Sequence, residues 1–385
     1  MASRAIKAAD QLRAQWYWKS SFDPSSTNEK EEWTKYSDIE SAIIEEAFNG
    51  NNKTKLIELD NYSINLNDSI QISQSDPNNQ QQIKRVLISR HENQGLREER
   101  FFLPPVLSKT FNTDWSRDAY TFLSQWKKHK KLSDTEIVKQ AADGIIIEGK
   151  KLGHECESQY IARQLIAVEN KGQQEIYKCC IQLYTMECFL YKLINKAIGE
   201  DDTSKANTLG PFCYILFRSW LKADTKHSPE LYRGANIDQN MLESYKEATG
   251  RERYWNGFTS TTRNRQKAQN FGNTLFIINA TNNGGLDISP FSNYDEDEVL
   301  LPPATVFKIK KLKKTPTQTY IYLKLRNYID DALLLYGRAL GSRRHHDADL
   351  DTHLRLLNLN ADARTTFYGV NGGARGGGGD GDDGV

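Results

Sequence analysis

Four acidic residues in a row, Asp295 to Glu298, stand directly before an apolar run in the stretch NYDEDEVLLPP. In an extended backbone, side chains two residues apart share a face, so we expect Glu296 and Glu298 to point the same way, with Asp297 opposed. Two carboxylates at the rim of a cleft can divide labour: one stabilises a developing positive charge and the other orients an acceptor. A sugar carbon that loses its leaving group becomes such a cation. Glycosyl transfer is therefore one interpretation, and a solvated acidic loop is the other.

Two upstream stretches add groups that fit the same chemistry. Arg233, in LYRG, lies between apolar residues of an expected strand, and its planar guanidinium suits a phosphate or a carboxylate. The stretch FTSTT, residues 258–262, carries hydroxyls that can bond a ribose or hold a carboxylate. Each stretch alone is weak, because threonine is common in strands and arginine often pairs with a structural acid.

Taken in this order and spacing, the three stretches resemble the arginine-specific mono-ADP-ribosyltransferases of the cholera- and clostridial-toxin-like class. The shared pattern is an arginine strand, a Ser-Thr-Ser-like strand with Thr262 in third position, and Glu-x-Glu before VLLPP. The resemblance runs over roughly residues 136–327, and LYTMECFLYKLINKAIGED is similar to the helical part of vertebrate-type members. It implies NAD as the substrate, no metal, and arginines of a target protein as the acceptor.

The resemblance also implies roles on the NAD side of the site. Arg233 would bind the NAD phosphates, and the backbone of Gly234 would hold the nicotinamide amide. Ser260 would bond near the nicotinamide ribose and position the catalytic carboxylate. Phe271 would stack on the nicotinamide ring.

On the acceptor side, the resemblance assigns different tasks to the two glutamates. Glu298 would hydrogen-bond the ribose and stabilise the oxocarbenium as nicotinamide leaves, and Glu296 would engage the acceptor guanidinium. The loop from Phe291 to Asp295 would face the target protein, with Phe291 or Tyr294 as the aromatic contact. The catalytic set is therefore predicted to be Arg233, Ser260, Glu296 and Glu298.

The N-terminal part carries a second resemblance, through WYW at 16–18, EEWTKY, NYSINL and IQIS, to the WWE domain. That fold is a half-barrel sheet with one helix, and its members bind iso-ADP-ribose, the terminal ADP-ribose of poly(ADP-ribose), or other proteins. The matching ligand positions are Trp18, Tyr62, Gln71 and Arg85, where aromatic faces would stack adenine and a basic residue would meet phosphate. An ADP-ribose site and a protein-interaction module both stay open, and Trp16, Trp33 and Tyr36 are expected to be core residues.

The expected organisation is an α+β chain with a WWE half-barrel at 11–92, a linker at 93–130, an ADP-ribosyltransferase domain at 131–327 and a poorly ordered tail at 328–385. The transferase part is expected to combine a helical subdomain with a split β-sandwich that binds NAD. Ser37 or Asp38 is expected to cap one helix that ends at Gly50, and Ser133 with Glu136 forms a capping box at the start of another. The apolar stretch 175–201 is expected to form a core helix.

The composition excludes several classes of protein. The formal net charge is +1, so no global attraction to nucleic acid or to an anionic membrane is expected. No apolar run approaches a membrane span, and the N-terminus lacks the apolar centre of a signal peptide, so we expect an intracellular protein, cytoplasmic or nuclear. Buried free thiols are the expected state of the cysteines. The basic run 127–131 is interpreted as a solvated helix face, and the histidine-rich run 343–353 as a solvated tail rather than a metal site.

Other functions stay open beside arginine transfer. Glu298 alone would support hydrolysis of NAD, which makes an NAD glycohydrolase the first alternative. An inactive ADP-ribose reader is the second, although the catalytic set is complete in the sequence. Synthesis of poly(ADP-ribose) is disfavoured, because no histidine occupies the Arg233 strand.

Overall fold

The computed structural model describes residues 12–20, 33–50, 56–90, 97, 100, 122–123, 125–126, 132–200, 202–222, 229–281 and 285–326. The remaining residues, among them the predicted tail, the basic run 127–131 and the histidine-rich run 343–353, lie outside the described parts. Contacts within the chain group everything up to Arg326 into one unit.

The N-terminal part is a six-stranded sheet with one helix, α2 (Asp38–Asn49). The sheet order is β2-β1-β6-β5-β4-β3, and every pairing is antiparallel. Strands β3 and β4 form a hairpin, because the chain turns between Glu58 and Tyr62. The strands are β1 (Arg13–Lys19), β2 (Trp33–Lys35), β3 (Leu56–Glu58), β4 (Tyr62–Asn65), β5 (Ile70–Ser73) and β6 (Gln80–Ile88).

Helix α2 begins and ends where the sequence predicts. The Ser37 hydroxyl accepts a hydrogen bond from the backbone N–H of Glu40, and the Glu40 carboxylate accepts one from the backbone N–H of Ser37, which completes a capping box. Gly50 follows the last turn. Ile39 and Ile44 are fully buried, so the helix covers one face of the sheet.

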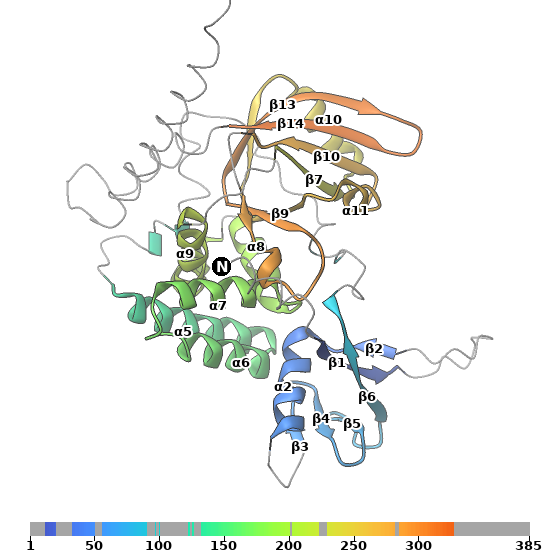
Figure 1. Ribbon diagram of the computed structural model, residues 1–385, viewed down its shortest axis with the longest axis vertical. Helices are drawn as coiled ribbons and strands as arrows, with labels where there is room; N and C mark the ends of the chain where they lie inside the picture. Colours follow the sequence, from blue (N-terminus) through green and yellow to red (C-terminus); the bar gives the residue numbers. More distant parts are fainter. Residues whose placement is uncertain are drawn as a thin grey trace, which may run out of the picture. The chain divides into compact units, whose positions relative to one another are not determined.

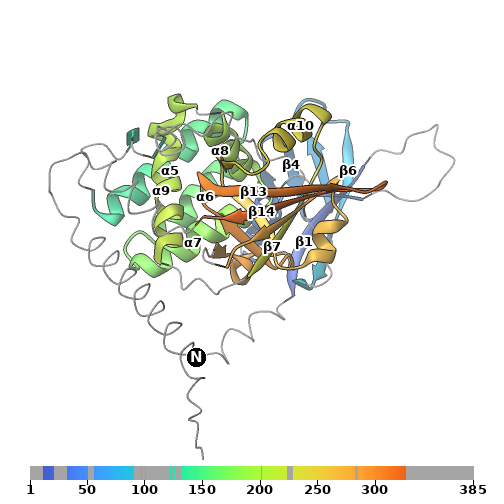
Figure 2. The same ribbon diagram turned by 90° about the horizontal axis from the view of Figure 1, so that it is seen from above.

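A group of five helices follows and lies to one side of the second sheet (Figures 1 and 2). The first of them has the predicted capping box of Ser133 and Glu136 and ends at Gly153, whose φ of 75° favours glycine. The stretch expected to form one core helix is two helices, because the chain is extended at Met186 and Cys188. The five are α5 (Asp134–Leu152), α6 (Glu155–Ile166), α7 (Gln173–Thr185), α8 (Phe189–Gly199) and α9 (Ala206–Lys222).

The second sheet has eight strands in the order β11-β12-β9-β7-β10-β14-β13-β8. Only β10 and β14 pair in parallel among the described strands. The strands are β7 (Glu230–Ala235), β8 (Glu252–Trp255), β9 (Thr259–Thr262), β10 (Thr274–Asn279), β11 (Leu286–Asp287), β12 (Glu298–Leu301), β13 (Thr305–Lys314) and β14 (Thr319–Leu325). Two helices lie between strands, α10 (Gln239–Glu247) and α11 (Arg265–Gln269), and short 3-10 turns occur at Thr203–Lys205 and Ser289–Phe291.

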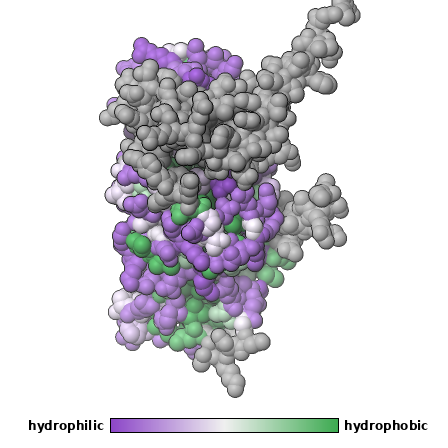
Figure 3. Space-filling view, turned by 90° about the vertical axis from the view of Figure 1, so that its left-hand side faces the viewer, coloured by the Kyte–Doolittle hydropathy of each residue, from purple (hydrophilic) through white to green (hydrophobic). Residues whose placement is uncertain are grey.

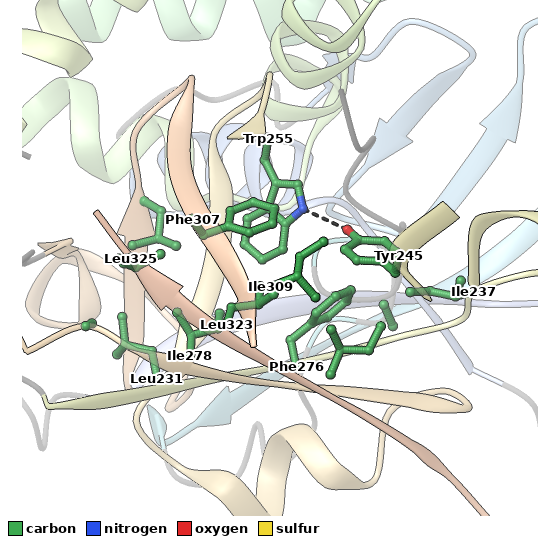
Figure 4. Close-up of a cluster of buried hydrophobic side chains, with 14 of the residues drawn as sticks. Leu231, Ile237, Tyr245, Trp255, Phe276, Ile278, Phe307, Ile309, Leu323 and Leu325 are labelled. Atoms are coloured by element: carbon green, nitrogen blue, oxygen red, sulfur yellow. Dashed lines mark hydrogen bonds between the residues drawn. The ribbon is translucent and has the colours of Figure 1, made fainter. Parts of the chain in front are cut away.

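The core of this sheet is a continuous apolar cluster that also contains one polar pair (Figure 4). The indole N–H of Trp255 donates to the Tyr245 hydroxyl at 2.8 Å, so both polar groups are satisfied while their rings pack against Phe276. Leu231 on β7 and Leu301 on β12 belong to this cluster. The core therefore fixes β7 and β12, which carry Arg233 and Glu298.

The face in Figure 3 mixes hydrophilic and hydrophobic residues. Within the described ranges, no helix has both the length and the hydropathy needed to cross a bilayer.

Candidate active site

Neighbouring strands bring the predicted catalytic residues together. Arg233 is on β7, Ser260 on β9 and Glu298 at the start of β12, and these strands are adjacent in the order β12-β9-β7. Glu298 lies opposite Thr262, and Leu300 lies opposite Ser260. Because alternate residues share a face, Ser260 and Glu298 project from the same side of this strand pair.

All four predicted catalytic side chains are buried. The exposed fraction is 4% for Arg233, 2% for Ser260 and 0% for both Glu296 and Glu298. Nη1 of Arg233 donates to the backbone carbonyl of Ser260 at 2.6 Å, so β7 and β9 are tied together at the site. Burial lowers the pKa of Arg233 to about 10, and the nearby Glu298 carboxylate opposes that shift.

The two glutamates do converge, but not through an extended backbone. Asp297 between them has a φ of 47°, in the left-handed region, and β12 begins only at Glu298. The carbonyl of Glu296 accepts from the Thr262 hydroxyl at 2.6 Å, and the carbonyl of Asp297 accepts from the backbone N–H of Arg263 at 3.2 Å. The end of β9 therefore fixes this bend, and an aspartate tolerates it better than most residues.

A guanidinium that the sequence analysis did not identify lies between the two carboxylates. Nη2 of Arg97 is 2.6 Å from Oε2 of Glu296 and 3.4 Å from Oε2 of Glu298. Nε of Arg100 donates to Oε1 of Glu298 at 2.8 Å. The shared contact with Arg97 confirms that Glu296 and Glu298 point the same way. Arginines are frequent in this chain, so nothing in the sequence around Arg97 and Arg100 singles them out.

The residues predicted to hold the nicotinamide also lie side by side. A Cβ placed on Gly234 would be 2.5 Å from the carbonyl oxygen of Phe271 and 2.6 Å from its Cβ, and closer still to the carbonyl of Ala268. Gly234 therefore lets β7 approach the end of α11, where Phe271 is half-buried.

This close approach predicts the effect of a single methyl group. We expect Gly234→Ala to destabilise the fold by about 1–3 kcal/mol, because backbone atoms on α11 have to move. Gly199→Ala is the matched control, since a Cβ there meets no atom within 4 Å. Thermal unfolding of both variants measures the difference, and equal melting temperatures would contradict the packing argument.

The loop expected to face a target protein is only partly exposed to solvent. Phe291 is half-buried, whereas Tyr294 is 4% exposed. The Tyr294 hydroxyl donates to Oδ1 of Asp38 at 3.0 Å, and Nζ of Lys35 lies 2.5 Å from that hydroxyl. Tyr294 therefore joins the loop to the N-terminal sheet and does not lie on an open surface, contrary to its expected role as a surface contact.

The four residues predicted to bind ADP-ribose lie on one face of the N-terminal sheet, as the register of its strands shows. They are Trp18 on β1, Tyr62 on β4, Gln71 on β5 and Arg85 on β6. The rings of Trp18 and Tyr62 are 6.5 Å apart. Gln71 is fully buried, accepts from the Tyr36 hydroxyl at 2.5 Å and donates to Gln81. Arg85 is paired with Glu45 through two hydrogen bonds of 2.7 and 2.9 Å.

Of the three residues expected in the core of this sheet, Trp16 and Tyr36 are buried, while Trp33 is half-buried.

Two family models match the chain, and between them they cover most of the first sheet and all of the second. The model described as NAD:arginine ADP-ribosyltransferase matches residues 127–330, more than half of the chain. The chain belongs to this family. The model of the WWE domain matches residues 14–85 of this ADP-ribosyltransferase. Membership supports an enzyme that transfers ADP-ribose with NAD as its substrate and acts on proteins.

Solved structures give only a distant similarity to this ADP-ribosyltransferase. The type III effector XopAI from Xanthomonas axonopodis pv. citri is 16% identical, with 58% of this chain and 96% of that chain covered at a TM-score of 0.40. ADP-ribosyltransferase HopU1 of Pseudomonas syringae pv. Tomato DC3000 is 17% identical, with 56% and 98% covered at 0.35. Exoenzyme S from Pseudomonas aeruginosa is 18% identical, with 56% and 96% covered at 0.35. Similarity of this extent carries no conclusion about activity, and no curated protein matches the sequence.

No group of three or more His, Cys, Asp or Glu side chains is arranged to hold a metal within the described ranges. The five cysteines are free thiols, and burial raises the pKa of Cys179 to about 11.

Proposed function

We propose that this ADP-ribosyltransferase modifies arginine side chains of proteins and releases nicotinamide from NAD. One observation carries the proposal: Glu296 and Glu298 both contact the same guanidinium nitrogen, Nη2 of Arg97. The carboxylate of Glu296 holds that guanidinium with a fork of hydrogen bonds, which is how a carboxylate recognises arginine. The nitrogen is at the same time directed toward Glu298, the residue expected beside the sugar cation.

The division of labour follows from charge. A sugar carbon that loses nicotinamide becomes positive, and the buried carboxylate of Glu298 stabilises it more strongly than a solvated carboxylate would. An acceptor guanidinium is protonated at any working pH and loses a proton as its nitrogen attacks. Glu296 orients that nitrogen and takes part in removing the proton. Arg233, on β7 two strands away from Glu298, supplies the positive charge that would meet the NAD phosphates.

This division predicts that the two activities separate in one variant. We expect Glu296→Gln to reduce transfer to an arginine polymer by about 10²-fold, because the amide no longer orients and deprotonates the guanidinium. Nicotinamide release by hydrolysis of NAD should persist, since Glu298 is unchanged. Radiolabel transfer and nicotinamide release, measured on the same sample, test this.

The control for Glu296→Gln is Glu243→Gln on α10, where the side chain is 46% exposed. It should leave both rates at the wild-type level. Undiminished transfer in Glu296→Gln would contradict the arginine-specific role, and the NAD glycohydrolase would become the better interpretation if the wild-type enzyme releases nicotinamide but labels no arginine.

We propose further that the WWE module binds ADP-ribose through Trp18 and Tyr62, whose rings lie on the same face as Gln71. Arg85 would have to exchange Glu45 for a phosphate. Calorimetry of the full chain with iso-ADP-ribose, compared with Trp18→Ala, tests this proposal. Unchanged heat in the variant would favour a protein-interaction module.

A further inference from the structure

Two arginines that precede the transferase helices in the sequence, Arg97 and Arg100, form ion pairs with the two predicted catalytic carboxylates. Arg97 makes four hydrogen bonds to Glu296: its backbone N–H donates at 2.9 Å, Nε reaches both oxygens at 3.1 and 3.2 Å, and Nη2 donates at 2.6 Å. Arg100 is paired with Glu298 and is 4% exposed. Both are far from the glutamates in sequence, so tertiary structure alone brings them here.

Arg97 is held as an arginine ligand is held, not as a surface ion pair. Its guanidinium carbon lies 4.2 Å from the centre of the Tyr294 ring, and Nη1 donates to the backbone carbonyl of Thr185. Burial disfavours the charge of Arg97, but the Glu296 carboxylate outweighs it and raises the pKa well above the ordinary value. Carboxylate fork, aromatic face and carbonyl together make a complete guanidinium site.

The position of one nitrogen distinguishes an acceptor from a structural ion pair. Nη2 of Arg97 is the atom within reach of both Glu296 and Glu298, at 2.6 and 3.4 Å. A structural pair needs only one carboxylate, whereas an acceptor nitrogen has to lie between the residue that orients it and the residue that stabilises the sugar cation.

We propose that Arg97 is the enzyme's own modification site: the chain transfers ADP-ribose from NAD to Arg97 within the same molecule. This inference rests on the proposed function of Glu296 and Glu298. In the reaction, the bond between nicotinamide and the ribose C1′ breaks, and neutral nicotinamide leaves with the electron pair. A bond forms between Nη2 of Arg97 and C1′, and one proton leaves the guanidinium through Glu296 to solvent.

Arg100 controls access of NAD in this arrangement. Its Nε donates to Oε1 of Glu298, where a ribose hydroxyl would bind, and its guanidinium carbon is 4.6 Å from the Tyr184 ring and 5.0 Å from the Tyr191 ring. NAD has to displace Arg100 before Glu298 can act, while Arg97 keeps its separate carboxylate, Glu296. Loss of the guanidinium at position 100 should therefore lower the KM for NAD.

The test uses the full chain, NAD labelled in the adenylate, and agmatine as a small external guanidine. We expect one ADP-ribose per chain, mapped to Arg97 by mass spectrometry with electron-transfer fragmentation. The rate should not depend on protein concentration, because acceptor and site are on one molecule. Arg97→Lys should lose this label, and the KM for agmatine should fall, because the external guanidine no longer competes with Arg97.

Arg100→Gln supplies an independent arm: we expect the KM for NAD to fall by about tenfold, which corresponds to one lost charged hydrogen bond. Agmatine labelling without label on Arg97, or self-labelling whose rate rises with protein concentration, would overturn the internal acceptor and leave the proposed function intact. An unchanged or higher KM in Arg100→Gln would overturn the role of Arg100. Absence of label on both agmatine and the chain would remove the proposed function together with this inference.

Discussion

Glu298→Gln is expected to reduce nicotinamide release from NAD by about 10²–10³-fold, with arginine transfer lost in parallel. Glu298 is fully buried at the start of β12 and faces the same side as Ser260. A glutamine keeps the shape and can still hydrogen-bond a ribose hydroxyl, but it cannot offset the positive charge of the sugar cation. The effect should therefore fall on the chemical step, so kcat falls and the KM for NAD changes less.

Two comparisons make the Glu298→Gln result specific. Glu296 contacts the same guanidinium as Glu298, that of Arg97. Glu296→Gln should nevertheless retain hydrolysis of NAD, so the two variants should differ in the rate of nicotinamide release. Unfolding temperatures should be measured alongside, because Arg100 loses its carboxylate partner in Glu298→Gln. Wild-type nicotinamide release by a folded Glu298→Gln protein would exclude this residue as the stabiliser of the cation.

Asp38→Asn is expected to destabilise the protein by about 3–5 kcal/mol, the usual cost of removing one partner from a buried charge cluster. Asp38 is 2% exposed, and its carboxylate lies 3.3 Å from Nη1 of Arg13 and 3.4 Å from Nζ of Lys35. It also accepts hydrogen bonds from the Tyr294 hydroxyl at 3.0 Å and from the backbone N–H of Glu187 at 2.9 Å. The substitution would leave two cations without their counter-charge.

Asp134→Asn is the matched control for Asp38→Asn. Both aspartates are the first residue of a helix that follows a serine cap, and both contact an arginine. The side chain of Asp134 is 36% exposed, so we expect a loss of about 1 kcal/mol or less. Chemical denaturation of both variants at neutral pH measures the difference, and equal losses would show that burial of Asp38 is not decisive.

The effect of Asp38 should also depend on pH. Burial raises the pKa of Asp38, but Lys35 and Arg13 outweigh it and hold the pKa below its ordinary value of 3.8. The stabilisation of the folded protein by the charged Asp38 is therefore complete above pH 3.8. It is lost as the pH falls through the lower pKa of Asp38 in the folded state. The difference between wild type and Asp38→Asn should shrink in acid and stay constant from about pH 5 to 7.

The catalytic strands were predictable because local sequence carries their signals. Every residue of β9 carries a hydroxyl, Arg233 interrupts an apolar strand, and Glu296 and Glu298 stand directly before the apolar run Val299–Leu301. The caps at Ser37 and Ser133 were predictable for the same reason, since capping depends on residues within one turn.

Failures of the prediction occurred where backbone geometry depends on distant partners. The stretch 175–201 breaks between α7 and α8, although its apolar residues continue across the break. At the break, the backbone carbonyl of Glu187 accepts from the N–H of Asp38, and the backbone N–H of Glu187 donates to the Asp38 carboxylate. The spacing of apolar residues along a helix does not reveal such contacts with a distant residue. Asp297 adopts a left-handed φ because β9 holds the carbonyls on either side of the bend.

Residue order alone specified the kind of chemistry in this ADP-ribosyltransferase: an arginine strand, a hydroxyl strand and paired glutamates, in the sequence that marks its family. Only tertiary structure decided which guanidinium meets those glutamates and that Tyr294 turns toward Asp38. The physical reason is that charge pairing inside a fold depends on distance and burial. The residues next to Arg97 in the sequence determine neither its distance to the glutamates nor its burial. Both are determined when the helices and the two sheets pack.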